Sequence, residues 1–391
     1  MSEAVIVSAC RTPIGSFMGA LGSIPAPRLG ALVVEESIRR AGIKKDDVQE
    51  VIMGNVLTAG EGQAPARQAA LFAGLPESVE CMTVNKVCGS GLKAVMLAAQ
   101  AVRLGDADII VAGGMESMSN VPFAVEKARG GLKLGHGEMT DLMIKDGLWD
   151  VYNNFHMGSA AELCAKECAI PREAQDAFSI RSYQRAQEAT NKGWFKEEIV
   201  PVRIPSKDGE TIVDKDEDPF KTNFDKIPKL KPVFQKDGTV TAANASKIND
   251  GAAALVVMSA ERAKVLGVKA LARIVTYASS AKKPEWFTTA PADVIRKTLD
   301  RAGMKQDDIG LFEINEAFAV VTLAVNKMLG LDEAKVNVHG GAVALGHPIG
   351  ASGARILVTL LHALRMRKQQ RGMAAICIGG GEASGVIVEL L

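Results

Sequence analysis

The sequence predicts an α/β fold that contains two copies of one unit, and two observations support this prediction. Short apolar runs of strand length alternate with longer amphipathic stretches of helical periodicity. Three short patterns near the start of the chain also return near its end, in the same order. With 391 residues, the chain is long enough for two or three domains around a large core. We therefore expect sheets covered by helices, arranged as two related halves.

The alternation is clearest towards the two ends of the chain. In chain order, we predict a strand at 4–9, a helix at 29–42, strands at 50–57 and 108–117, and two final strands at 374–381 and 385–391. Leu92, Val95, Met96 and Ala99 recur at helical spacing, which predicts a further helix after the glycine-rich turn CGSG.

The repeated patterns define the boundaries of the two units. Their paired positions are Arg40–Val48 with Arg301–Ile309, Cys88–Gly91 with Gly350–Gly353, and Ile109–Glu116 with Ala375–Glu382. A common helix–turn–strand connection explains one such match, whereas three matches in order at nearly constant spacing indicate duplication. We predict an N-terminal unit at 1–119, a C-terminal unit at 260–391 and a different segment at 120–259.

The segment 120–259 is expected to form an inserted loop domain over the active site, with its final part returning to the N-terminal unit. Residues 207–230 are charged and contain prolines, which predicts a surface loop. Residues 168–193 predict a helix, because Pro171 stands near its start and Gly193 at its end. Loops beyond the strand ends carry the active sites of open α/β sheets, so the insertion is expected to wall a substrate channel.

Charge and cysteine content argue against several classes of protein. The 46 basic and 45 acidic residues leave a formal net charge of +1, so nothing favours nucleic acid or an acidic membrane surface as a partner. The six cysteines show no CxxC spacing, which is typical of reduced thiols, and we expect a cytoplasmic protein. We identify no secretory signal and no apolar run of membrane-spanning length, so we expect no membrane partner.

Cys88 is the first candidate for chemistry. It lies between an apolar run and the turn Gly89–Gly91, immediately before a predicted helix. The unpaired N–H groups and positive dipole end of a helix N-terminus favour an anion and can lower a thiol pKa from about 8.5 into the neutral range. The competing interpretation is a small buried thiol beside a tight turn, as most free cysteines are.

Two further candidates lie at glycine-rich turns in the second unit. His347 stands among glycines and a proline before a predicted helix, whereas His362 lies in an apolar periodic run. Cys377 follows an apolar strand and precedes Gly379–Gly381, whose backbone N–H groups are free to point at an oxyanion. If the two copies pack with pseudo-twofold symmetry, Cys88, His347 and Cys377 converge at the strand ends as nucleophile, base and acid/base.

Other chemistries lack their sequence motifs. The sequence has no HExxH and no cysteine pair at zinc spacing, so we predict no metal. It also has no Walker sequence and no GxGxxG after a strand, which argues against nucleotide hydrolysis and hydride transfer.

Four motifs together resemble the signatures of the thiolase family. They are NKVCGSG at 85–91, INEAFA at 314–319, GHPIGASG at 346–353 and CIGGG at 377–381. The similarity runs from Val5 to Leu391, and two further stretches, at 156–162 and 244–254, are similar to the short-chain, acetoacetyl-CoA-forming branch. The resemblance implies duplicated units in a layered α-β-α-β-α core. It also implies an acetyl-CoA C-acetyltransferase, which condenses two acetyl-CoA molecules and catalyses the reverse thiolysis through an acyl-cysteine.

The resemblance implies a role for each catalytic group. Cys88 becomes acylated, His347 activates it and helps to bind the thioester oxygen, and Cys377 moves the proton of the second acyl-CoA. Asn315 holds a water for one oxyanion hole, while the backbone N–H groups of Cys88 and Gly379 form the other. No cofactor is expected, since the coenzyme A thioesters are substrates.

The resemblance also predicts how substrates are bound and how subunits assemble. The residues expected to contact the pantetheine arm are Leu148, Ser246, Ala317 and Phe318, and those expected to border the acyl pocket are His156 and Met157. Phe287 is a further candidate substrate contact, because it could decide the size of the pocket. Family members often carry arginine near the CoA phosphates, where this chain has Phe220 with Lys221 beside it. Lys221 is therefore the candidate phosphate contact. The segment 121–139 resembles the region that joins two dimers in similar thiolases, which predicts a homotetramer.

Four other interpretations compete with this one. A β-ketoacyl synthase shares the duplicated fold but lacks the cysteine of CxGGG, so Cys377 favours a thiolase. A broad-chain degradative 3-ketoacyl-CoA thiolase has the same motifs and differs in pocket size, which Met157 or Phe287 could decide. A Cys–His thioester hydrolase needs open access for water, which the insertion is expected to exclude. A non-catalytic CoA-binding scaffold does not need the full catalytic set.

Overall fold

The main strands of the two halves form one hydrogen-bonded path. The computed structural model describes residues 2–206 and 209–391, and the strands follow the order β14-β15-β16-β13-β1-β12-β5-β3-β4. The first half contains β1 (Ala4–Arg11), β2 (Gly15–Ser16), α1 (Ala26–Ala41), β3 (Glu50–Gly54), α2 (Pro65–Phe72), β4 (Glu80–Val84), α3 (Ser90–Leu104), β5 (Ile109–Ser117) and β12 (Asn249–Ser259). The second half, after α6 (Ala260–Leu266), contains β13 (Ala272–Ala281), α7 (Ala290–Ala302), β14 (Leu311–Ile314), α8 (Ala319–Leu329), α9 (Ala342–Leu345), α10 (Ile349–Met366), β15 (Arg371–Ile378) and β16 (Glu382–Leu390).

The two halves repeat one topology. In the first, β3 runs parallel to β5, which pairs antiparallel with β12, which pairs antiparallel with β1. In the second, β14, β15, β16 and β13 follow the same order with the same senses. The repeated sequence RAGxKxDD forms the same turn twice, since Lys44 N donates to Asp47 Oδ2 and Lys305 N donates to Asp308 Oδ2. The duplication is therefore structural as well as sequential.

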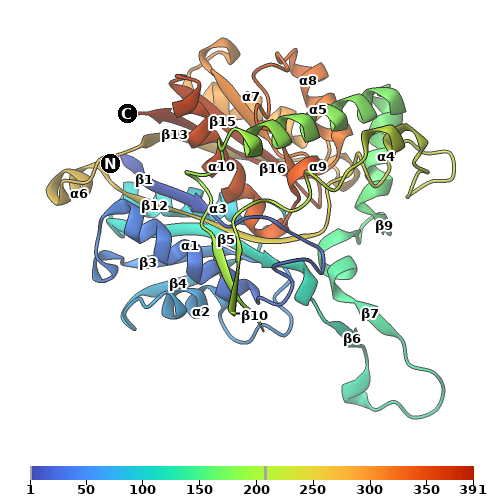
Figure 1. The fold of residues 1–391 in the computed structure, drawn as a ribbon, viewed down its shortest axis with the longest axis horizontal. Helices are drawn as coiled ribbons and strands as arrows, with labels where there is room; N and C mark the ends of the chain where they lie inside the picture. The colour runs from blue at the N-terminus through green and yellow to red at the C-terminus, as the bar shows by residue number, and fades with distance from the viewer. Residues whose placement is uncertain (1, 207–208) are drawn as a thin grey trace.

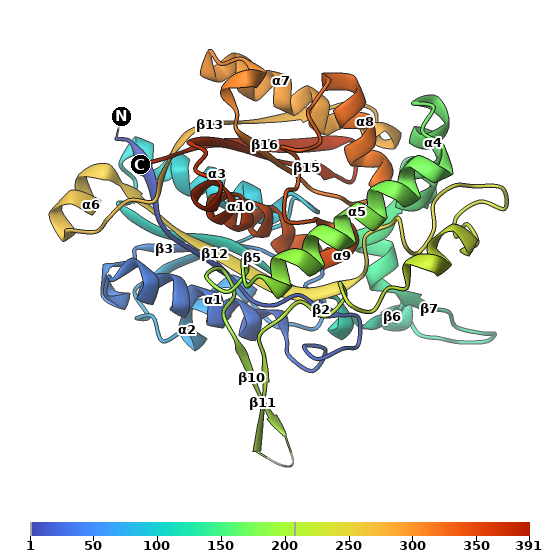
Figure 2. The same cartoon turned by 45° about the horizontal axis from the view of Figure 1, so that its top comes forward.

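Helices and sheets alternate in five layers (Figures 1 and 2). β1 and β13 join the halves through only two residue pairs, Val5–Arg273 and Ile6–Ala272. From this junction the two sheets diverge, and α3 and α10 fill the space between them (Figure 2). α1 and α2 cover the outer face of the first sheet, and α7 and α8 lie outside the second. The predicted α-β-α-β-α layering is thus confirmed.

The repeated glycines explain how the two central helices meet. A Cβ on Gly91 would lie 2.9 Å from Ala354 N, and a Cβ on Gly353 would lie 2.4 Å from Leu92 N. Both contacts are with backbone atoms, which cannot move aside as a flexible side chain can. Each copy of the pattern xxSG therefore supplies the glycine that lets the first turns of α3 and α10 touch.

The segment between the halves forms a cap with two projecting hairpins. Its elements are β6 (Phe123–Val125), β7 (Met139–Asp141), β8 (Trp149–Asp150), β9 (Phe155–His156), α4 (Met157–Glu167), α5 (Arg172–Asn191), β10 (Val202–Ser206) and β11 (Gly209–Val213). The β6–β7 and β10–β11 hairpins extend away from the body, and α4 and α5 pack against α8 (Figures 1 and 2). The helix predicted at 168–193 begins only at Arg172, because Pro171 occupies the N-cap.

Two sequence predictions require correction. Residues 207–230 are not simply a surface loop: residues 207–208 lie outside the described part, 209–213 form β11, and Asp216 is buried against Arg11. The charge of Arg11, which Glu198 also contacts at 2.6 Å, compensates the buried carboxylates. The second correction concerns the prediction that no apolar run reaches membrane-spanning length. The helical window Val87–Leu104 is long and apolar enough to cross a membrane. It contains α3, which packs between the two sheets as a core helix.

Candidate active site

A cavity of about 590 Å³ lies where the inserted cap meets both halves. All eight residues predicted to bind substrate line it: Leu148, His156, Met157, Lys221, Ser246, Phe287, Ala317 and Phe318. Of the five predicted catalytic residues, Cys88, His347 and Gly379 line the cavity as well. Asn315 and Cys377 do not line it and are buried, each with 1% of its surface exposed. The pseudo-twofold packing therefore brings Cys88 and His347 from different halves to one cavity.

Cys88 stands on a tight turn between β4 and α3. Val87 has a φ of 45°, which is unusual for a β-branched residue and costs on the order of 1–3 kcal/mol. The turn is held by hydrogen bonds from Gly89 N to Lys86 O at 3.0 Å and from Lys86 N to Ser90 Oγ at 2.8 Å. A Cβ on Gly89 would lie 2.3 Å from Ile378 Cδ1, so glycine lets this turn approach the end of β15.

The thiol of Cys88 is protonated at neutral pH, contrary to the expectation from the helix terminus. Burial raises its pKa to about 11, although the backbone N–H groups of Gly379 and Cys88 itself act in the opposite direction. Desolvation outweighs the dipole because the charged form loses more from burial than it gains at the helix N-terminus. The two N–H groups are the same two that were predicted to form an oxyanion hole, and both act on the sulfur.

His347 is neutral, and its hydrogen bonds define its tautomer. Burial lowers its pKa to about 3, and the charge of Arg355 lowers it further. Ser352 Oγ donates its one proton to Pro348 O at 2.8 Å, so the 2.6 Å contact between His347 Nδ1 and Ser352 Oγ requires Nδ1 to be the donor. Nε2 therefore carries the lone pair, and it has no hydrogen-bond partner among the described residues. A neutral imidazole with a free Nε2 is prepared to accept a proton.

Asn315 and Cys377 lie behind the cavity wall at the ends of adjacent strands. Asn315 N donates to Ala375 O at 3.0 Å, while neither side-chain amide atom has a protein partner in the described residues. Unpaired buried amide groups are expensive, which is consistent with a site that holds water or a substrate oxygen. Burial raises the pKa of Cys377 well above its usual value, and the nearby Cys88 contributes in the same direction. The turn after Cys377 needs glycine, because Gly381 has a φ of 87° and a Cβ there would lie 2.5 Å from Lys282 O.

Part of the cavity wall is apolar and aromatic. His156 stacks on Phe234 with ring centroids 4.8 Å apart, and Phe318 lies 6.3 Å from Phe234 and 6.5 Å from Phe287. Met157 belongs to the same cluster of buried side chains as Cys377. The side chains of His156, Met157, Phe234, Phe287 and Phe318 all line the cavity.

Lys221 lies at the cavity rim, where a phosphate contact was predicted. Its ammonium donates to Ser16 Oγ at 2.7 Å and to Glu217 Oε1 at 3.2 Å. Phe220 does not line the cavity and is 51% exposed. Of the two residues, only Lys221 is placed to meet a ligand in the cavity.

Sequence reasoning missed three residues of this site. Phe234, Ser352 and Lys247 carry functional contacts. Ser352 lies within the motif at 346–353 and Lys247 within the stretch at 244–254, but neither residue was assigned a role. The spacing of five residues between His347 and Ser352 across a helix start could have indicated a hydrogen bond. Phe234 lies in none of the motifs, and the stretch that contains Lys247 does not by itself indicate which residues its side chain contacts. Within residues 2–206 and 209–391, no group of three His, Cys, Asp or Glu side chains is placed to hold a metal ion.

The duplicated five-layered core, with a cysteine and a neutral histidine lining one cavity, is typical of an acyltransferase. Residues 4–261 match the model for "Thiolase, N-terminal domain" and residues 268–390 the model for "Thiolase, C-terminal domain". The chain is 54% identical, over 391 residues and the full length of both proteins, to the acetyl-CoA acetyltransferase of Cupriavidus necator. The chain belongs to the thiolase family.

Two solved structures are similar over the entire chain. The acetyl-CoA acetyltransferase of Bacillus anthracis superimposes with a TM-score of 0.98 at 43% identity, covering 100% of this chain and 99% of that one. The Acat5 thiolase of Ascaris suum in complex with coenzyme A has a TM-score of 0.95 at 46% identity, with both chains fully covered.

Proposed function

We propose that the protein is an acetyl-CoA C-acetyltransferase that joins two acetyl-CoA molecules into acetoacetyl-CoA and free CoA, and catalyses the reverse thiolysis. The observation that carries the proposal is the shared cavity of Cys88 and His347, whose Nε2 is free to take a proton. The similarity to acetyl-CoA acetyltransferases, and to a thiolase that binds coenzyme A, supports the same activity. We also propose that it acts in the cytoplasm with its six cysteines reduced; all six are free thiols in the structure.

In the first half-reaction, the acetyl group moves to Cys88. The thiol proton passes to Nε2 of His347 as the sulfur attacks the thioester carbonyl, and the carbonyl oxygen becomes an oxyanion that hydrogen-bond donors stabilise. The C–S bond to CoA then breaks. The thiol of Cys377, whose raised pKa keeps its proton at neutral pH, protonates the departing CoA sulfur and becomes a thiolate.

In the second half-reaction, that thiolate removes a proton from the methyl group of a second acetyl-CoA. The resulting enolate carbon attacks the acetyl carbonyl on Cys88 and forms the new C–C bond. Cys88 leaves as a thiolate and recovers its proton from His347, so every group returns to its starting state. Water bound by Asn315 is proposed to stabilise one of the oxyanions.

We expect a steep loss of activity with longer substrates, because four bulky side chains line the cavity: Met157, Phe234, Phe287 and Phe318. One additional methylene costs about 1–3 kcal/mol in such a pocket, whereas a chain many carbons longer requires the walls to move. The test is kcat/KM for thiolysis of ketoacyl-CoA substrates from four to sixteen carbons. A flat or rising series would support a broad-chain degradative thiolase instead and would leave the acyl-transfer chemistry intact.

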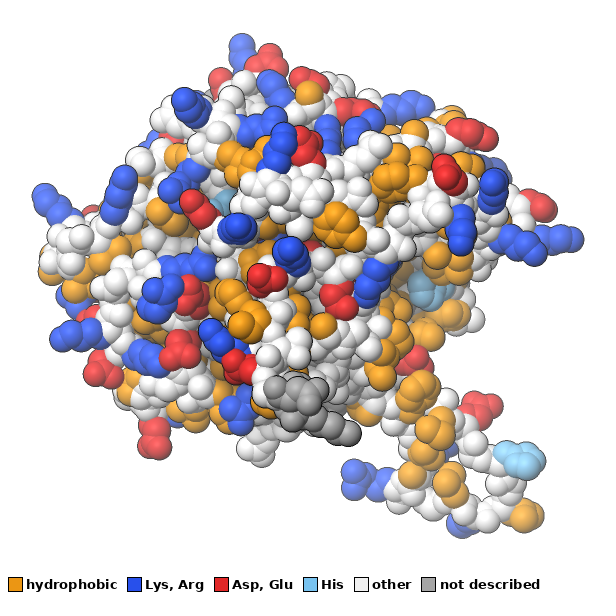
Figure 3. Space-filling model, in the orientation of Figure 1, with side chains coloured by type: hydrophobic (Ala, Val, Ile, Leu, Met, Phe, Trp, Pro, Cys, Tyr) orange, Lys and Arg blue, Asp and Glu red, His pale blue; other side chains and the backbone are white. Residues whose placement is uncertain are grey.

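We further propose a homotetramer in which the β6–β7 hairpin joins two dimers. This hairpin extends from the body and displays apolar side chains (Figure 3): Phe123 is 57%, Leu132 61% and Leu134 fully exposed. Exposed apolar groups on a projecting arm are typical of an association surface.

Shortening residues 126–138 is expected to convert tetramers to dimers, since the arm loses its apolar contacts. Sedimentation velocity measures the mass directly. Replacing the exposed Val265 on α6 by serine is the control, because it removes an apolar group remote from the arm. An unchanged mass after shortening would exclude this role for the hairpin.

A further inference from the structure

Lys247 is a charged residue in the cavity wall that the catalytic motifs do not explain. Its ammonium donates to the hydroxyl oxygen of Tyr183 and, at 3.3 Å, to the carbonyl oxygen of Val343. It also lies 4.7 Å from the centroid of the Tyr183 ring, and Tyr183 is fully buried on α5. A cation held by a phenol oxygen, a carbonyl and a ring face occupies a fixed position.

The two ends of this contact belong to different parts of the site. Lys247 stands between Ser246 and Ile248, which both line the cavity. Val343 lies in α9, immediately upstream of the loop that carries His347, and its N–H donates to Glu316 Oε2 at 3.1 Å. Glu316 follows Asn315 directly. Val343 is therefore fixed at its carbonyl by Lys247 and at its N–H by the residue next to Asn315.

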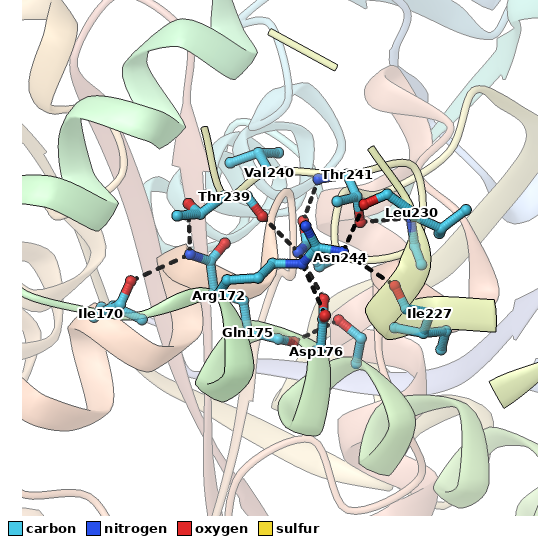
Figure 4. Close-up of polar contacts among 12 residues, drawn as sticks. Ile170, Arg172, Gln175, Asp176, Ile227, Leu230, Thr239, Val240, Thr241 and Asn244 are labelled. Atoms are coloured by element: carbon cyan, nitrogen blue, oxygen red, sulfur yellow. Dashed lines mark hydrogen bonds and ion pairs between the residues drawn. The ribbon is translucent and has the colours of Figure 1, made fainter. Parts of the chain in front are cut away.

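The cavity-wall segment 244–249, which contains Lys247, contacts the region around His347 at a second position. Asn249 Oδ1 accepts a hydrogen bond from His347 N at 3.0 Å, so two alternate residues of one segment hold the loop. On its other side the segment is anchored to α5, because Asn244 Nδ2 donates to Asp176 Oδ1 at 3.1 Å (Figure 4). The backbone of Ser246 is bonded to Ala317 O at 3.0 Å. Hydrogen bonds therefore connect the cavity-wall segment 244–249 to the loop that carries His347.

We propose that Lys247 is a positioning residue that couples the wall of the pantetheine cavity to the catalytic base. If the proposed function holds, the arm of the substrate binds against a wall whose position fixes His347. Binding energy from the non-reacting arm then contributes to the alignment of imidazole, thiol and thioester. A base displaced by about 1 Å can lose about 100-fold in rate, so loosening this brace has a measurable effect.

The test is the single-turnover rate of Cys88 acetylation in Lys247→Met, which keeps an unbranched side chain one atom shorter and removes the charge. At saturating acetyl-CoA this rate is expected to fall about 10- to 100-fold relative to the parent. A smaller fold-loss is expected with S-acetyl-N-acetylcysteamine, because a substrate that lacks most of the arm cannot use the wall to align the base. Tyr183→Phe removes the acceptor oxygen and is expected to lose less, and the double variant is expected to be no slower than Lys247→Met alone.

Controls separate this role from others. Lys236→Met, at an exposed lysine of the same cap, is expected to match the parent. If Lys247→Met raises KM but leaves the saturating rate unchanged, Lys247 is an arm contact and the proposal is wrong. If the variant only unfolds at a lower temperature, Lys247 is structural and the proposal is equally wrong. Restoration of Lys247→Ala by added ethylammonium supports a positioned cation even where the substitution destabilises the fold. Acetylation of the parent is measured first and tests the proposed function separately.

Discussion

Cys88→Ser is expected to abolish covalent acetylation and to lower the thiolysis rate by at least about 1,000-fold. Serine keeps the shape of the turn, but its hydroxyl is a far weaker nucleophile towards a thioester than a thiol that shares its cavity with a neutral imidazole. The measurement is incubation with radiolabelled acetyl-CoA followed by sequencing of the labelled peptide. The parent should carry label on the peptide that contains Cys88, and the variant should carry none.

Cys81→Ser is the matched control, because Cys81 is a partly exposed cysteine on β4 and lies outside the cavity. It should acetylate like the parent. The pH dependence of alkylation provides a second measurement: with the pKa of Cys88 at about 11 and that of His347 at about 3, no thiolate–imidazolium pair exists at rest. Alkylation by iodoacetamide should therefore rise steadily with pH above 7. An alkylation rate that reaches a plateau near pH 7 would contradict the protonated thiol. Acetyl label on a peptide without Cys88 would contradict the assigned nucleophile.

Cys377→Ala is expected to acetylate at Cys88 but to condense about 100- to 10,000-fold more slowly than the parent. The variant keeps the nucleophile and His347, yet it lacks the group proposed to protonate departing CoA and to deprotonate the second substrate. The acetyl-enzyme should consequently accumulate. Exchange of the methyl protons of acetyl-CoA with deuterated solvent, followed by NMR, measures the missing step directly.

Cys164→Ala is the matched control for this substitution. Cys164 is buried in the same apolar cluster as Cys377 and acts on its pKa, but it does not line the cavity. Its replacement removes a similar volume and should leave proton exchange near the parent rate. If Cys377→Ala formed acetoacetyl-CoA at close to the parent rate, Cys377 would be only a strand residue.

Much of the fold could be predicted because the signals are local or repeated. Alternating apolar runs indicate strands and helices over a few residues, and the duplicated RAGxKxDD and CGSG/GASG patterns indicate two equivalent units. Packing of the two repeated units brings Cys88 of the first and His347 of the second to one cavity. Six of the eight substrate residues were assigned by family resemblance, Lys221 as a replacement for the family's arginine and Phe287 as a determinant of pocket size. The structure brings all eight to that cavity.

The sequence by itself determined the duplicated units, the turn that carries Cys88 and the motifs that identify the family. Only the tertiary structure decided the protonation of Cys88, the tautomer of His347, the burial of Asp216 and the brace formed by Lys247. The physical reason is the distance along the chain over which each interaction acts. Turn and periodicity preferences act between neighbours in the chain, whereas desolvation depends on everything packed around a group. Lys247 and Val343 are far apart in sequence, and only the packed halves bring the ammonium to that carbonyl.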